Sequence, residues 1–293
     1  MKKKAFLYIV LAGLSWGTSG IFVHYLAPYG FSSLQMTFVR ALVSFLCLGG
    51  YALLRDRSVF RVTWKQLLLC IGVGAGIFFT ASCYFTSMQM TSVSTAVVLM
   101  YTAPVYVTVV SVLFMGERMS KLKLMAVICI MVGCVLVSGF VTGMKFDLMG
   151  IIIGVFSGIA YAAYNILTKL ALQQGCKPVT TTVYSFAAMT VIAALVCQPG
   201  QIINYAGAAP AVTVPLLIGM GICTCVMPYV LYTLSMKDLS AGTASALGII
   251  EPMAATVYSV VLFREELDIF SGAGIVLILA SVFLLGKAED KAG

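Results

Sequence analysis

Charged residues are scarce in this chain of 293 residues. Asp, Glu, Lys and Arg together make up 10% of it, against about 25% in an average soluble domain. Hydrophobic residues make up 61%, and the mean hydropathy is +1.05. This composition excludes a soluble globular protein and a disordered chain. The net charge of +8 is spread along the chain and forms no basic face, so we expect no nucleic-acid partner.

The sequence also has few groups for chemical catalysis. It contains one histidine, His24, and nine cysteines without the spacing of a zinc or thioredoxin site. It shows no phosphate-binding loop and no recognisable nucleophile–base pair. We therefore expect no enzyme activity, no cofactor and no metal site.

What the sequence does have is a series of long uncharged runs. A membrane-spanning helix needs roughly 20 apolar residues. The runs 66–116 and 178–236 are long enough for two spans each, and the shorter runs for one or two. The pattern predicts an all-α polytopic membrane protein with ten spans at 5–25, 33–54, 66–88, 92–115, 122–141, 148–169, 178–197, 212–236, 241–263 and 269–286.

The basic residues give these spans an orientation. Lys and Arg concentrate in cytoplasmic loops of membrane proteins. With the N-terminus placed in the cytoplasm, nearly all loop Lys and Arg residues fall on that side, and only Lys145 and Arg264 fall outside. Both termini are therefore predicted to be cytoplasmic, which requires an even number of spans.

An internal repeat relates the two halves of the chain. Shifting the sequence by 148 positions aligns 84–117 with 232–265 without a gap and pairs Pro104 with Pro252. We therefore divide the chain into repeats at 1–145 and 146–293, each with five spans. Because five is odd, the second repeat is inverted in the membrane, an architecture found in many secondary transporters.

Several motifs make the whole chain resemble the drug/metabolite transporter superfamily, in its ten-helix EamA type. They are Trp16-Gly17 in span 1, Arg40 in span 2, Pro104 in span 4 with Gly116-Glu117-Arg118 directly after it, and Glu251-Pro252 in span 9 with Arg264-Glu265-Glu266 directly after it. The resemblance implies a transporter of the prokaryotic plasma membrane that exports amino acids or other small metabolites, although some members of the family import. Arg264 departs from the pattern, because Gly116 stands at that place in the first half.

Glu251 is the first candidate site residue, because it is an acid near the middle of a predicted span. A charge at the bilayer centre costs at least roughly 2.5 kcal/mol, so such residues usually face a cavity. Pro252 cannot donate to the carbonyl of residue 248, which predicts a free carbonyl beside the carboxyl group. Two interpretations are open: Glu251 carries a coupling proton, or it is a neutral structural clamp between helices.

Arg40 is the second candidate, because it lies inside span 2. A guanidinium group binds carboxylates with two parallel hydrogen bonds, so Arg40 could hold a substrate carboxylate or pair with Glu251. It could instead extend to the outer headgroups.

The remaining candidates are aromatic residues, an amide and the two mid-span prolines. Pro104 and Pro252 are predicted hinges, although each could be a tolerated kink. Deep aromatic and amide side chains could line a substrate cavity or simply pack between helices. This set consists of Trp16, Tyr84, Tyr101, Tyr161, Tyr164, Asn165, Tyr229 and Tyr258.

Together these features predict a secondary-active or facilitative transporter of small metabolites that works by alternating access. Its expected partners are a small-molecule substrate, the lipid bilayer and, if Glu251 titrates, a proton. The oligomeric state stays open. The alternatives are an intramembrane or lipid-modifying enzyme, which needs further polar catalytic residues, and a non-transporting scaffold, which does not need a midplane Glu.

Overall fold

The structure is a computed structural model, and it describes residues 2–91, 93–116, 119–137, 147–264 and 268–292. Within these ranges the regular secondary structure is entirely helical. Glu117, Arg118, Lys145, Glu265 and Glu266, which contributed to the sequence predictions, lie outside the described residues, as does the predicted boundary between the repeats.

The helices lie largely within the predicted spans, but the spans 5–25, 92–115, 212–236 and 241–263 are each divided, and residues 199–208, between two predicted spans, are helical. They are α1 (Lys2–Gly17), α2 (Ser19–Leu26), α3 (Ser33–Arg55), α4 (Trp64–Met90), α5 (Val93–Met100), α6 (Ala103–Phe114), α7 (Lys121–Val137), α9 (Leu148–Gln173), α10 (Pro178–Ala194), α11 (Pro199–Ala208), α12 (Pro210–Gly221), α13 (Met227–Ser235), α14 (Ala241–Leu247), α15 (Ile250–Phe263) and α16 (Ile269–Ala292). Three short turns, η1 (Ala27–Tyr29), η2 (Arg57–Phe60) and the π-helical η3 (Ile222–Val226), complete the set.

Seven of the described helical stretches are long and apolar enough to cross a membrane. An eighth is obtained if α10 and α11, which meet at 93°, count as one bent span. The apolar stretches Lys121–Val137 and Ile269–Leu285 are shorter, at 17 residues each for α7 and the apolar part of α16. By length and composition the structure therefore supports an all-α polytopic membrane protein with seven or eight spans.

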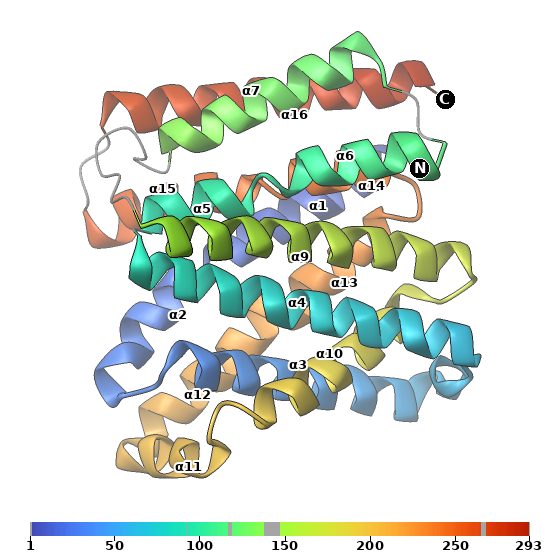
Figure 1. The fold of residues 1–293 in the computed structure, drawn as a ribbon. Coiled ribbons are helices and arrows are strands. Elements are labelled where there is room, and N and C mark those ends of the chain that lie inside the picture. Colours follow the sequence, from blue (N-terminus) through green and yellow to red (C-terminus); the bar gives the residue numbers. More distant parts are fainter. Residues whose placement is uncertain (1, 92, 117–118, 138–146, 265–267, 293) are drawn as a thin grey trace.

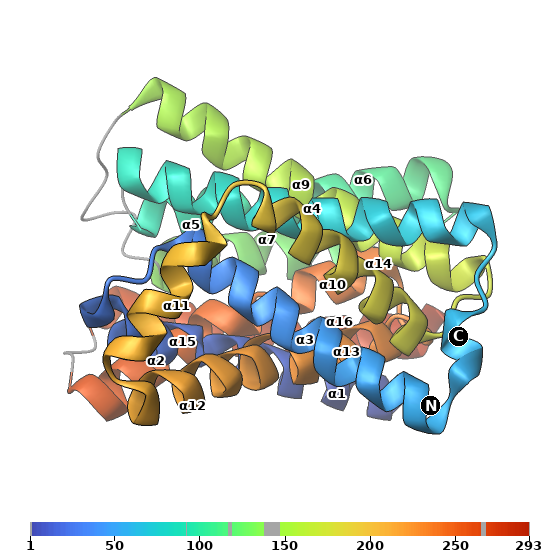
Figure 2. The ribbon, with the colours of Figure 1, turned by 90° about the horizontal axis from the view of Figure 1, so that it is seen from below.

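The helices form a bundle in which distant segments of the chain pack side by side. Figure 1 shows α4 next to α9 in the middle and α7 next to α16 at one edge, and these two pairs have the most extensive helix contacts. In Figures 1 and 2 the start of α1 and the end of α16 lie at the same end of the bundle. The short helix α11 lies at the opposite end.

The surface and the interior have the polarity expected for a protein dissolved in lipid. Leu54, Phe114 and Leu195 are each at least 80% exposed on the surface. The interior, in contrast, buries hydroxyl and amide side chains such as Ser157, Asn165 and Thr168. Thr168 satisfies its hydroxyl within its own helix, by donating to the Tyr164 carbonyl oxygen at 2.7 Å. Because lipid offers no hydrogen bonds, such internal pairing is required.

Glycine residues set the closest helix approach near the middle of the bundle. Gly13 and Gly17 of α1 are four residues apart, so they share one helix face. A Cβ atom at Gly13 would lie 2.7 Å from Cβ of Ile250, and one at Gly17 would lie 2.7 Å from Cβ of Ala254. The Gly-x-x-x-Gly spacing therefore lets α1 pack directly against α15.

Candidate functional site

A cavity of about 740 Å³ lies inside the bundle and contains most of the predicted site residues. Its walls come from α1, α2, α3, α4, α5, α7, α9, α12, η3, α13, α15 and α16. The sequence-predicted residues that line it are Trp16, Arg40, Tyr84, Tyr101, Tyr161, Tyr164, Tyr229, Glu251 and Pro252. This volume is in the range of small-molecule sites.

Helix breaks bring several of these residues to the cavity wall. Tyr101 lies between α5 and α6, and Glu251 lies in the first turn of α15, directly after the break that follows α14. At the second break Glu251 N donates to the Gly248 carbonyl oxygen at 3.0 Å. The Gly248 carbonyl oxygen was predicted to be free, because Pro252 has no N–H to donate to it. It instead accepts from Glu251 N, since the chain forms a tighter hydrogen bond to the residue three positions earlier.

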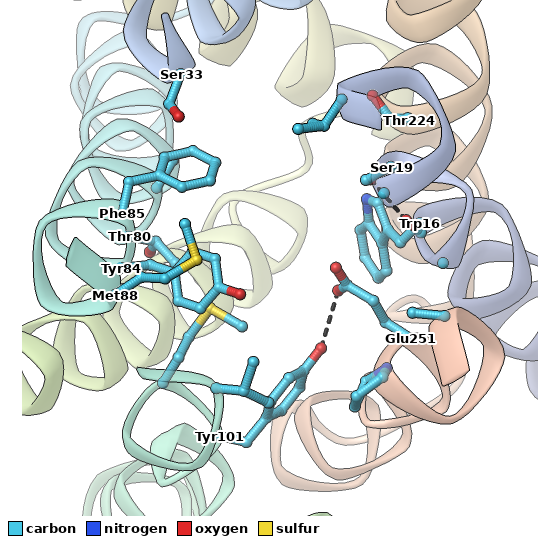
Figure 3. Close-up of a pocket in the computed structure, with 18 of the residues that line it drawn as sticks. Trp16, Ser19, Ser33, Thr80, Tyr84, Phe85, Met88, Tyr101, Thr224 and Glu251 are labelled. Atoms are coloured by element: carbon cyan, nitrogen blue, oxygen red, sulfur yellow. Dashed lines mark hydrogen bonds between the residues drawn. The ribbon is translucent and has the colours of Figure 1, made fainter. Parts of the chain in front are cut away.

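Glu251 is held by one tertiary hydrogen bond. The Tyr101 hydroxyl donates to Oε2 of Glu251 at 2.9 Å, and Tyr101 itself is 1% exposed. Figure 3 shows the carboxylate pointing into the cavity, with the Trp16 ring beside it and the Tyr84 hydroxyl on the facing wall. Trp16 reaches this position because the Gly13–Gly17 face of α1 packs on α15.

An aromatic cluster continues from this carboxylate across the cavity wall. The ring centroids of Tyr101 and Tyr161 are 6.2 Å apart, and the Tyr161 and Tyr164 rings stack at 5.8 Å. Tyr164 contacts Tyr229 at 5.7 Å, and Tyr229 contacts Trp16 at 5.1 Å in an edge-to-face arrangement. Such a wall offers apolar surface together with hydroxyl groups.

Three predicted residues lie outside the cavity wall. Asn165 is fully buried, where it donates to the Tyr161 carbonyl oxygen at 2.7 Å and accepts from the Tyr232 hydroxyl. The Tyr258 hydroxyl donates to the Leu14 carbonyl oxygen at 3.1 Å. Pro104 is buried at the start of α6 and is not among the lining residues, so it does not face Pro252 across the cavity. In these positions Asn165 and Tyr258 join helices rather than contact the cavity.

Arg40 lines the cavity without an ion-pair partner. The described residues contain one ion pair, between Lys177 and Asp56 at 2.7 Å, and Arg40 does not take part in it. Its Nε is buried and has no hydrogen-bond partner among those residues. Arg40 nevertheless lies within electrostatic reach of Glu251 and Tyr229. The predicted contact between Arg40 and Glu251 is therefore electrostatic but not a salt bridge.

The cavity also uses residues that sequence reasoning missed. On α4, Thr80, Phe85 and Met88 line one wall together with the predicted Tyr84, and Thr80, Tyr84 and Met88 recur every four residues (Figure 3). On α3, Thr37 lies one turn before Arg40. A polar residue recurring at i and i+4 inside an apolar span indicates one helix face, and this signal was available in the sequence.

The lining reaches one end of the bundle, where Asp268 lies. Its carboxylate accepts from Phe270 N at 2.7 Å and from the Ser271 hydroxyl at 2.6 Å, so it caps the start of α16. The hydrogen bonds from Ser271 keep the pKa of Asp268 below its usual value. An ionised carboxylate therefore stands beside Ser271 at this end of the cavity.

At the opposite end, two lysines hold the connection between α13 and α14. Lys169 of α9 donates to the carbonyl oxygens of Met236 at 2.6 Å and Leu239 at 2.7 Å. Lys123 of α7, which is 6% exposed, contacts the Ser240 hydroxyl at 3.1 Å. None of these residues lines the cavity. Here α7 belongs to the first half of the chain and α9 to the second. Because both helices bind the connection between α13 and α14, these contacts close the bundle at this end.

Comparisons of sequence and structure identify proteins that are similar to this chain. The model of the EamA-like transporter family matches residues 3–139 and again residues 148–287. An uncharacterized transporter of Archaeoglobus fulgidus is 31% identical over 94% of each chain. The uncharacterized transporter YwfM of Bacillus subtilis is 23% identical over 97% of this chain and 94% of its own.

A crystal structure of a protein 16% identical in sequence superposes with a TM-score of 0.80 over 100% of this chain and 99% of the other. At this identity the match concerns the fold alone. The two matched stretches of the family model cover nearly all of the sequence, and they include the helices that form the cavity. The chain is a member of the EamA-like transporter family.

Proposed function

We propose that this protein moves small metabolites across a prokaryotic plasma membrane by alternating access, as a secondary-active or facilitative transporter. The observation that carries the proposal is the central cavity, which reaches one end of the bundle and is lined by the acids Glu251 and Asp268 and the cation Arg40. At the other end Lys169 and Lys123 hold the bundle closed. Export of amino acids or related metabolites is the first activity to test.

The proposal includes ten spans arranged as two inverted repeats. The positions of the two helix breaks support this arrangement. When the sequence is shifted by 148 positions, Met100 at the end of α5 aligns with Gly248, which directly follows the end of α14 at Leu247. The tandem match of the family model supports a boundary near residue 145. The apolar helices α7 and α16 would complete the ten spans, each as the fifth of its repeat.

The orientation proposed from the Lys and Arg residues places both termini in the cytoplasm. The start of α1 and the end of α16 lie at one end of the bundle, as an even number of spans requires (Figure 1). Lys169 is at this same end, so the closed side would be cytoplasmic and the cavity would reach the outer side. The structure would then correspond to an outward-facing state.

Glu251 is proposed to carry a coupling proton. Several titratable groups act on its charge: Arg40 on α3, Tyr84 on α4, Tyr101 at the α5–α6 break, Tyr161 on α9 and Tyr229 on α13. Tyr101 can donate to an ionised carboxylate or accept from a neutral one. Proton exchange at Glu251 therefore does not require the loss of this contact.

Pro104 and Pro252 are proposed as hinges, because each lies within three residues of a helix break. In alternating access α6 and α15 would swing about these breaks, while α14 keeps its contacts with α6.

The alternative of an enzyme needs catalytic groups that act together. Among the described residues, no three His, Cys, Asp or Glu side chains gather at a possible metal site. Glu251 and Tyr101 provide one carboxyl group and one hydroxyl group that donates a hydrogen bond to it. This pair suits proton binding better than hydrolysis. A scaffold role leaves the cavity without an explanation.

Flux through proteoliposomes tests the proposal. Purified protein would be reconstituted, and uptake of a panel of radiolabelled amino acids, carboxylic acids, sugars and nucleosides would be compared with that of empty liposomes. We expect at least one solute to show saturable flux that unlabelled solute inhibits. Binding without flux for every solute that stabilises the protein would contradict transport.

A further inference from the structure

Arg40 is the cation inside the cavity for which the structure gives no anionic partner. The described residues place no carboxylate within ion-pair distance of it, and its Nε is buried without a hydrogen-bond partner. Its helix begins at Ser33, so Arg40 lies about two turns inside the bundle. Arg40 as a whole is partly buried, and a buried donor such as its Nε that makes no hydrogen bond is unfavourable, because its desolvation is not compensated.

The surrounding helices fix α3, and with it the backbone of Arg40. The π-helical turn η3 packs against α3, where a Cβ atom at Gly221 would lie 2.5 Å from Cγ1 of Val43. The Ser44 hydroxyl donates to the Arg40 carbonyl oxygen at 2.7 Å and contacts the Gly221 carbonyl oxygen at 3.4 Å. π-Helical turns often occur at functional sites. This close packing holds Arg40 at the cavity wall instead of allowing α3 to turn it toward lipid.

Glu251 lies within electrostatic reach of Arg40, and the other cavity residues on α3, α12, η3 and α13 are apolar, aromatic or hydroxylic. Thr37 lies one turn away on α3, and Met220 of α12 and Thr224 of η3 line the wall. Tyr229 is within electrostatic reach of Arg40, and its ring packs on Trp16. A ligand that brings an anionic group to Arg40 would therefore place the rest of its body against aromatic surface.

The balance of charges in the cavity decides which anion fits. Its lining contains the one cation Arg40 and two acids, Glu251 and Asp268. A single guanidinium matches the two oxygens of a carboxylate by a bidentate hydrogen-bonded pair. A dianionic phosphate would meet two acids with only one cation. The charge balance therefore favours a monoanion.

We propose that Arg40 is the recognition site for a carboxylate on the transported solute, with the apolar body of that solute packed against Trp16 and Tyr229. The proposal rests on the proposed transport function and names the chemical class of its substrate: small monocarboxylates, with or without an amine.

Thermal stability of the purified full-length protein in nanodiscs tests this directly. The probes are butyrate, isocaproate and L-leucine, each compared with its own primary amide, plus methyl phosphate. We expect the wild type to bind at least one carboxylate about 10-fold or more tighter than the matching amide, which is the ratio expected for a charge-assisted hydrogen-bonded pair. Isothermal titration calorimetry of the probes that stabilise the protein gives the ratio.

Two variants and one control identify the residue. Arg40→Gln should remove the preference for the carboxylate over the amide, and Arg40→Lys should keep part of it because the charge remains. Arg55→Gln removes an exposed arginine from the other end of α3 and should keep the wild-type ratio. If Arg40→Gln fails to fold, Arg40→Lys still has to lower the ratio.

Several outcomes would overturn the proposal. They are equal stabilisation by every carboxylate and its amide, no stabilisation by any carboxylate, a larger effect of methyl phosphate, or an unchanged ratio in both Arg40 variants. Flux measurements separate this failure from failure of the transport proposal. Saturable flux of an uncharged solute without carboxylate binding removes only the role of Arg40, whereas carboxylate binding without flux removes only transport.

Discussion

The hydroxyl of Tyr101 donates a 2.9 Å hydrogen bond to Oε2 of Glu251, and this contact joins two helix breaks that are 150 residues apart in sequence. Tyr101 directly follows α5, and Glu251 is the second residue of α15. Two titratable side chains of the cavity wall therefore contact each other, one from each half of the chain, while the carboxylate still faces the cavity (Figure 3).

The first prediction concerns proton coupling by Glu251. Glu251→Gln keeps the side-chain volume and can still accept from Tyr101, but it cannot release a proton. We expect a folded protein that loses the pH dependence of flux and any proton-driven accumulation, while downhill exchange survives. Flux measured between about pH 5.5 and pH 8 in proteoliposomes checks this.

Tyr101→Phe is the matched control, because it removes the hydrogen bond and leaves the carboxyl group in place. It should shift the pH midpoint of flux without abolishing the pH dependence. A stable Glu251→Gln protein with wild-type flux at every pH would contradict the role as proton carrier.

The second prediction concerns the closed end of the bundle. Lys169→Met removes the donors that hold the carbonyl oxygens of Met236 and Leu239. The turn should then open more often, because buried carbonyl groups lose their partner. Hydrogen–deuterium exchange of the peptide containing 236–240 should rise clearly above the wild type.

The neighbouring Lys237 provides the control for this experiment. It is exposed on the same turn, so Lys237→Met removes a lysine without changing these contacts. Equal exchange in the two variants would mean that Lys169 does not close this end.

The third prediction concerns the packing of α1 on α15. Gly13→Ala adds a methyl group where only 2.7 Å is available to Cβ of Ile250. We expect a loss of about 1–3 kcal/mol in unfolding free energy and lower flux, because Trp16 is displaced from Glu251. Gly50→Ala, where no atom lies within 4 Å, should be neutral or stabilising by up to about 1 kcal/mol. Denaturant unfolding of both proteins in detergent gives the comparison.

The fourth prediction follows from an ion pair outside the spans. Lys177 donates to Asp56 at 2.7 Å, and together with Ser58 it lowers the pKa of Asp56 from 3.8 to about 2. Because the pKa is lower in the folded state, the pair stabilises the protein above pH 3.8 and loses this effect as the pH falls toward 2. Both side chains are exposed, so the effect is small.

Asp56→Asn should therefore lower the melting temperature slightly at neutral pH and have no effect near pH 2. High salt should reduce the difference at neutral pH, because it screens exposed charges. A difference that grows on acidification would contradict the sign of this contribution.

The fifth prediction tests the orientation of the bundle. Arg57 lies in the connection between α3 and α4, which is predicted to be cytoplasmic. In intact cells, Arg57→Cys should not react with a membrane-impermeant thiol reagent after subtraction of the background from the native cysteines. Rapid labelling of intact cells would invert the proposed topology.

The sequence by itself determined the class of fold and the extent of the unbroken helices, but not the breaks inside the predicted spans 92–115 and 241–263. Long uncharged runs have one stable form in lipid, since every backbone group must find a partner within its own segment. That reasoning depends on local composition, which is why predicted spans such as 33–54 and 148–169 agree with α3 and α9. It also found Glu251 and Arg40, because single charges stand out in apolar runs.

Only the tertiary structure decided which of the candidate residues face the cavity. Tyr161 and Asn165 are one turn apart on α9, yet Tyr161 lines the cavity and Asn165 bonds to Tyr232. Which way a helix faces depends on close contacts with other helices, such as Gly13 against Ile250, and these join residues more than 200 positions apart. For the same reason the sequence left open whether Arg40 pairs with Glu251, whereas the packing of α3 on η3 keeps the two apart inside one cavity.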